Sequence, residues 1–113
     1  MVDQVTLKPH TSGDTWLGLT LTLTRNNAPM DLAGARVDMQ MRRVAASTAI
    51  LQSWTSSGLT PSILISGNTI SVGKRQITGV GKIYFDVQVT KVDGDVLTVM
   101  SGVLPVVEDV TRV

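Results

Sequence analysis

The sequence has no cysteine, a single histidine and four aromatic residues in a chain of 113 residues. The absence of cysteine excludes disulfide bonds and thiolate metal sites, and it fits a reducing compartment better than a secreted small domain. One histidine leaves any catalytic triad or His-His metal pair incomplete. We expect this residue, His10, which follows Pro9, to be an incidental surface residue. No cofactor or metal is predicted.

Charge is also scarce. Charged residues make up 17% of the chain, and ten basic against nine acidic residues give a net charge of +1. A field this weak does not attract nucleic acid or an anionic membrane, and no stretch approaches the roughly 18 apolar residues of a membrane span. Phosphate-binding and nucleophile-elbow motifs are missing. The sequence therefore predicts a protein without enzymatic activity that binds neither nucleic acid nor membrane.

Strict alternation of apolar and polar residues is the strongest positive signal. Over residues 14–24, Leu17, Leu19, Leu21 and Leu23 fall on one face of a strand, and Trp16 falls on the other with the threonines. Successive strand side chains point to opposite faces, so the pattern predicts four buried leucines and makes Trp16 the best candidate for an exposed contact.

The same alternation recurs in two longer segments. Residues 35–43 place Ala35, Val37, Met39 and Met41 on one face, although Met, Gln and Arg would also suit a helix. Residues 82–91 place Ile83, Phe85, Val87 and Val89 together. Both segments are predicted to be half-buried strands.

Shorter strands and turns fill the remaining chain. Strands are predicted over residues 49–54, 62–66, 68–72 and 95–108, with a hairpin at Ser66-Gly67-Asn68. Asp93-Gly94 predicts a two-residue type I′ hairpin. Residues 73–81 have room for a single helical turn. Gly102 and Pro105 interrupt the last strand, which indicates a bulge or an edge position.

These elements predict a single all-β domain over residues 1–113, with its core over about 12–112 and about seven or eight strands. Turns every eight to twelve residues are typical of a β-sandwich or a small barrel. An open sandwich has unpaired edges. The candidates are the strand that contains Pro105 and a short strand around Val5 to Leu7.

Three ordered groups of residues carry a family resemblance. Gly13-Asp14-Thr15-Trp16 precedes the Leu/Thr strand and a turn that includes Asp31-Leu32-Ala33-Gly34. Tyr84-Phe85-Asp86-Val87 precedes Asp93-Gly94, and the chain closes on Gly102-Val103-Leu104-Pro105 and Asp109-Val110-Thr111-Arg112. This order resembles small immunoglobulin-like β-sandwich domains of tailed-bacteriophage and prophage structural proteins, such as the N-terminal domain of baseplate upper proteins.

The resemblance implies a virion structural protein of the tail, baseplate, neck or head, made in the bacterial cytoplasm. It would act as a homo-oligomer or a ring-bound subunit that contacts other virion proteins. The motif residues then have structural roles in turns, hairpins and strand ends: Asp31, Leu32, Gly34, Asp93, Gly94, Asp109 and Arg112. A carbohydrate-binding or adhesion module is the alternative, and it would use Trp16, Trp54 and Tyr84, which are also the candidate partner contacts.

Overall fold

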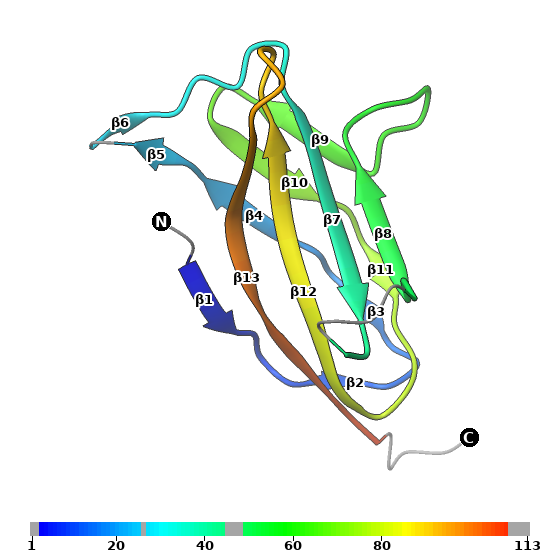
Figure 1. The fold of residues 1–113 in the computed structure, drawn as a ribbon. Helices are drawn as coiled ribbons and strands as arrows, with labels where there is room; N and C mark the ends of the chain where they lie inside the picture. The colour runs from blue at the N-terminus through cyan, green and yellow to red at the C-terminus, as the bar shows by residue number, and fades with distance from the viewer. Residues whose placement is uncertain (1–2, 26, 45–48, 109–113) are drawn as a thin grey trace.

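Every regular element of the chain is a β-strand in the computed structural model, which describes residues 3–25, 27–44 and 49–108 (Figure 1). The strands are β1 (Asp3–Thr6), β2 (His10–Thr11), β3 (Thr15–Trp16), β4 (Leu19–Thr22), β5 (Thr24–Arg25), β6 (Ala28–Pro29), β7 (Arg36–Arg42), β8 (Gln52–Thr55), β9 (Ile63–Ser66), β10 (Thr69–Val72), β11 (Arg75–Gln76), β12 (Gly81–Thr90) and β13 (Val96–Val107). Within these ranges, no helix is long and apolar enough to cross a membrane.

Two sheets organise these strands. The larger sheet has the order β1-β13-β12-β7-β8, and β2 also pairs with β13. The smaller sheet has the order β4-β10-β9 and lies behind the larger one in Figure 1. Two short pairs, β3 with β11 and β5 with β6, extend the ends of the smaller layer. The fold is therefore all-β and sandwich-like, with predominantly antiparallel pairing.

The strands β7 and β12 confirm the alternation predicted for them. They pair in antiparallel register, with Val87 opposite Met39 and Phe85 opposite Met41. These side chains are buried, and the side chains between them, such as Gln40 and Asp86, lie on the other face. The period of two thus overrides the helix propensity of the methionines and glutamine in β7.

One hydrophobic cluster joins the two sheets. Ile63, Ile70 and Val72 from the smaller sheet are buried in the same cluster as the inner residues of β7, β12 and β13. The predicted core leucines Leu19, Leu21 and Leu23 are half-buried and pack against it. Full burial of a side chain of this size contributes roughly 1.5–3 kcal/mol, so the contact between the sheets dominates the stability of the fold.

The predicted strand over residues 14–24 breaks at Gly18, which has a positive φ of 83°. A Cβ atom at this position would collide with the carbonyl oxygen of Val72. The break separates β3 from β4. Side chains that precede Gly18 therefore point to the face opposite to the one that an unbroken strand would give them. Trp16 is therefore buried and Leu17 is 73% exposed, so the prediction of a buried Leu17 and an exposed Trp16 is wrong.

The hairpin at Asp93-Gly94 has a longer loop than the sequence predicts. The Gly94 N–H donates to the Lys91 carbonyl at 2.9 Å, and the Lys91 N–H donates to the Asp95 carbonyl at 2.7 Å. Of the loop residues, Gly94 alone has a positive φ. A type I′ turn needs two such residues, so the loop is a three-residue turn that ends in a left-handed glycine.

The last strand, β13, lies inside the sheet, so its predicted edge position is wrong. The Val103 carbonyl accepts a hydrogen bond from Leu7 N–H at 2.9 Å, and the Val107 carbonyl accepts one from Ser12 N–H at 2.8 Å. Alternate residues of a strand face the same neighbour, so Pro105 faces the gap between β1 and β2. Its missing N–H therefore removes no ladder bond.

Two further expectations for the connecting segments are wrong. Residues 73–81 contain β11, which pairs with β3, and a buried Ile77 rather than a helical turn. His10 is buried, with its Nε2 atom 3.0 Å from the carbonyl oxygen of Asp14. A carbonyl only accepts, so Nε2 is the donor in this bond. Both segments lack a long alternating pattern, and tertiary contacts decide their conformation.

The break at Gly18 generates a stability prediction. We expect Gly18→Ala to destabilise the protein by about 3 kcal/mol, because it adds backbone strain and a collision with a fixed carbonyl. Gly58→Ala is the matched control, since Gly58 also has a positive φ but has nothing within 4 Å of a built Cβ; its loss should be about 1 kcal/mol. Urea unfolding measures both, and equal losses would contradict the steric role of Gly18.

Candidate functional site

Three of the four aromatic side chains belong to the core. Trp16 is 8% exposed and Trp54 is 2% exposed, and their ring centroids lie 5.5 Å apart in an edge-to-face arrangement. Phe85, which was expected in the core, is also buried. The predicted partner-contact role is therefore wrong for Trp16 and Trp54. Gly18 causes the error for Trp16, because it reverses the direction of that side chain.

Trp54 is held on several sides. Its indole N–H donates to the Gly73 carbonyl at 3.1 Å, and the guanidinium carbon of Arg75 lies 4.6 Å from the centre of its ring. Arg75 in turn donates to the Ser53 carbonyl at 2.6 Å. Trp54 thus links β8 to the segment that follows β10, and a sugar-binding role for this ring is excluded by its burial.

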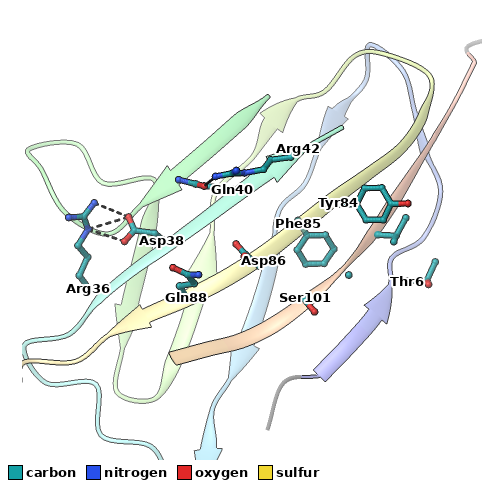
Figure 2. Close-up of a pocket in the computed structure, with 12 residues that line it drawn as sticks. Thr6, Arg36, Asp38, Gln40, Arg42, Tyr84, Phe85, Asp86, Gln88 and Ser101 are labelled. Carbon is teal, nitrogen blue, oxygen red and sulfur yellow. Dashed lines mark hydrogen bonds and ion pairs between the residues drawn. The ribbon is translucent and has the colours of Figure 1, made fainter. Parts of the chain in front are cut away.

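Tyr84 is the exposed aromatic residue. Its side chain is 36% exposed and lies on the outer face of the larger sheet, between Arg42 on β7 and Val103 on β13. Figure 2 shows its ring at one end of a row of polar side chains. Of the three aromatic residues proposed as contacts from the sequence, Tyr84 is therefore the one available to a partner.

The outer face of the larger sheet is hollowed into a groove of about 920 Å³. We call it the outer groove. It spans four strands, β7, β12, β13 and β1 (Figure 2), and is lined by Thr6, Arg36, Asp38, Gln40, Arg42, Tyr84, Phe85, Asp86, Gln88, Ser101, Gly102 and Val103. The sequence predicts the outward direction of the β7 and β12 side chains, but it does not predict the groove that they line together with β13 and β1.

The β7 side of the outer groove consists of two polar pairs. Arg36 forms an ion pair with Asp38 at 3.0 Å, and Arg42 donates to the Oε1 atom of Gln40 at 2.7 Å. Each pair joins residues two positions apart on the same strand face. An exposed ion pair contributes at most about 1 kcal/mol to stability, so these pairs chiefly fix the directions of their side chains along the wall.

Asp86 stands at the centre of the outer groove, between Gln40 on β7 and Ser101 on β13. The residue is half-buried, and its carboxylate accepts no hydrogen bond from, and forms no ion pair with, any residue that the structure describes. A carboxylate has about four acceptor positions. Asp86 therefore has unused acceptor positions on the floor of the groove, and Figure 2 shows its side chain among those of Gln40, Gln88 and Ser101.

The structure brings two of the predicted turn motifs together at one end of the molecule. Asp31 Oδ1 accepts the Ala33 N–H at 3.0 Å, and Leu32 is buried. Gly34 has a positive φ, and a Cβ there would lie 3.2 Å from a methyl carbon of Val92, beside Asp93-Gly94. The turn thus supports the tip of the β12–β13 hairpin, as structural residues would.

The predictions for Asp109 and Arg112 lie outside the described residues. Among the residues that are described, no three His, Cys, Asp or Glu side chains are grouped closely enough to hold a metal ion. Tyr84 is predicted from the sequence as a contact residue, whereas Asp86 and its neighbours are not predicted as a group. A sequence signal existed, because the outward positions of both β7 and β12 carry long polar side chains instead of the threonines found on β4.

The burial of Trp54 can be tested against the exposure of Tyr84. Trp54→Ala should lower the free energy of unfolding by about 3–5 kcal/mol, because it leaves a large cavity and an unpaired Gly73 carbonyl. Tyr84→Ala should lower it by about 1 kcal/mol or less. Urea unfolding of both variants checks this, and a small loss for Trp54→Ala would show that its ring is not a core element.

Comparison with known proteins gives no indication of the function. No family model, no curated protein and no solved structure matches this chain.

Proposed function

We propose that this chain is a non-enzymatic structural subunit of a phage virion, located in the tail, baseplate, neck or head and assembled through protein–protein contacts. Its partners are other virion proteins, in a homo-oligomer or a ring, after synthesis in the bacterial cytoplasm. The ordered motifs of the sequence support the phage origin. Support for assembly comes from the open edges of the smaller sheet.

The proposal includes an immunoglobulin-like topology. In variable-type immunoglobulin domains, strands G, F, C and C′ form one sheet, and B, E and D lie in the other. The order β13-β12-β7-β8 opposite β4-β10-β9 supports an equivalent arrangement. The chain differs from antibody domains in that it has no cysteine for an inter-sheet disulfide and carries a buried tryptophan, Trp54, on β8 instead of β7.

The open edge of β4 is the observation that carries the assembly proposal. The Leu23 N–H donates to the Asn68 carbonyl at 2.9 Å, so Leu21 and Leu19, two and four positions earlier, also direct their backbone groups toward β10. Thr20 and Thr22 direct theirs to the opposite side, where β4 pairs with no other described strand. An unpaired edge of this kind accepts a strand from another chain.

Particles of the phage or prophage that carries the gene provide the direct test. We expect the chain in gradient-purified particles at a fixed copy number, measured by quantitative mass spectrometry. Deletion of the gene should leave particles that lack a tail, neck or baseplate component in electron micrographs. Complete, infectious particles without the chain would contradict the proposal.

A substitution at the β4 edge tests the mode of assembly. Thr22→Pro removes an outward N–H and should reduce incorporation into particles at least ~10-fold, while the fold is kept because proline is tolerated on an edge strand. Thr22→Ala is the control, since it removes the same hydroxyl but retains the N–H. Thermal unfolding of both variants checks folding, and equal incorporation of two folded variants would exclude this edge as the contact.

A further inference from the structure

The outer groove lies on a different surface from the open edge of β4. Its floor belongs to β12, which pairs along its length with β13 on one side and β7 on the other. The backbone hydrogen bonds of this floor are consequently used within the sheet. A peptide therefore has no edge here on which to add as a strand, and any ligand of the groove must be recognised by side chains alone.

We propose that the outer groove binds a neutral glycan chain. The exposed face of Tyr84, with Val103 beside it, offers an apolar platform for the C–H face of a sugar ring. Asp86, two positions along the same face of β12, offers an unpaired carboxylate that accepts hydrogen bonds from sugar hydroxyls. One aromatic ring beside a polar acceptor matches the amphipathic character of a pyranose.

The walls of the groove supply further hydroxyl partners. Gln40 and Gln88 are half-buried amides that both donate and accept, and Ser101 lies across from Asp86 on β13. The lining residues Arg36 and Arg42 lie six positions apart on β7, which is about 20 Å at roughly 3.3 Å per residue. This length suits a chain of several sugar units better than a single monosaccharide.

Charge selects for a neutral ligand. The charged side chains that line the groove are Arg36, Arg42, Asp38 and Asp86, which sum to zero. The Arg36 guanidinium is paired with Asp38, and Arg42 donates to Gln40. The unpaired charge at the centre is the negative one of Asp86, which repels an anionic polymer. Sugar hydroxyls satisfy this carboxylate without a counter-ion.

The glycan proposal does not rest on the virion proposal, because it uses another surface and the purified full-length chain. The first experiment applies that chain to a printed array of neutral oligosaccharides built from glucose, galactose, mannose and N-acetylglucosamine, with uronic-acid chains as the anionic comparison. Binding to one or more neutral chains is expected, with weaker or no binding to the uronic-acid chains. Titration calorimetry with the best neutral chain then gives the dissociation constant.

Two substitutions in the groove localise the site. Tyr84→Ala and Asp86→Ala should each weaken binding at least ~10-fold, which is about 1.4 kcal/mol. Tyr84→Phe keeps the ring and should bind within about threefold of the parent, a change below ~0.7 kcal/mol. Ser71→Ala, on the outer face of the smaller sheet, is the control that should leave binding unchanged. Thermal unfolding confirms that each variant is folded.

Three outcomes would overturn the proposal. The first is no binding to any neutral chain on the array, and the second is binding that both folded groove variants leave intact. The third is self-association of the chain, seen by sedimentation and abolished by Tyr84→Ala and Asp86→Ala, which would assign the groove to a second copy. Failure to enter particles, in contrast, would affect only the virion proposal.

Discussion

The pairing of β12 with β7 on one side and β13 on the other is the interaction on which the rest of the structure depends. It fixes the direction of every side chain on the three central strands of the larger sheet. Ile83, Phe85, Val87 and Val89 meet the smaller sheet, and the residues between them face outward. A shift of one residue would exchange the two sets. Core and groove are therefore two consequences of one register.

Gly102 shows how that register accommodates the core. It pairs directly with Phe85, whose side chain is buried on the inner face. Cross-strand aromatic–glycine pairs of this kind compensate for the weak packing of glycine in a strand. The bulge in β13 occurs elsewhere, between the partners of Val87 and Gln88, where Val99 is the extra residue.

Long alternating segments were predictable from the sequence, because the period of two is repeated often enough to exclude a helix. Strands β7 and β12 and the hairpin at Gly67 follow from local patterns. Trp16 could not be placed this way. Its direction depends on a positive φ at Gly18, where the carbonyl of Val72, 54 residues away in the chain, leaves no room for a Cβ atom. Long-range contacts of this kind leave no periodic signal.

The outer groove was predictable in part. Alternation shows that Tyr84 and Asp86 share a face, but the neighbours of each residue depend on the order of the strands, in which β13 rather than β8 lies next to β12. That order places Ser101 beside Asp86 and Val103 beside Tyr84. If the order of the strands is not known, the pattern of polar residues on β7 and β12 is the same as that of an ordinary solvated sheet face.

Stability alone does not explain the residue at the centre of this face. A carboxylate on a half-buried residue contributes to stability chiefly through a charge-assisted hydrogen bond from a neighbouring donor. Asp86 has no such partner among the described residues, whereas Asp38, also half-buried on the neighbouring strand, has Arg36. A threonine would suit a β-strand better at this position. Departures of this kind from the residue that folding favours are expected at binding sites, and for that reason Asp86, more than Tyr84, distinguishes the groove from a merely solvated surface.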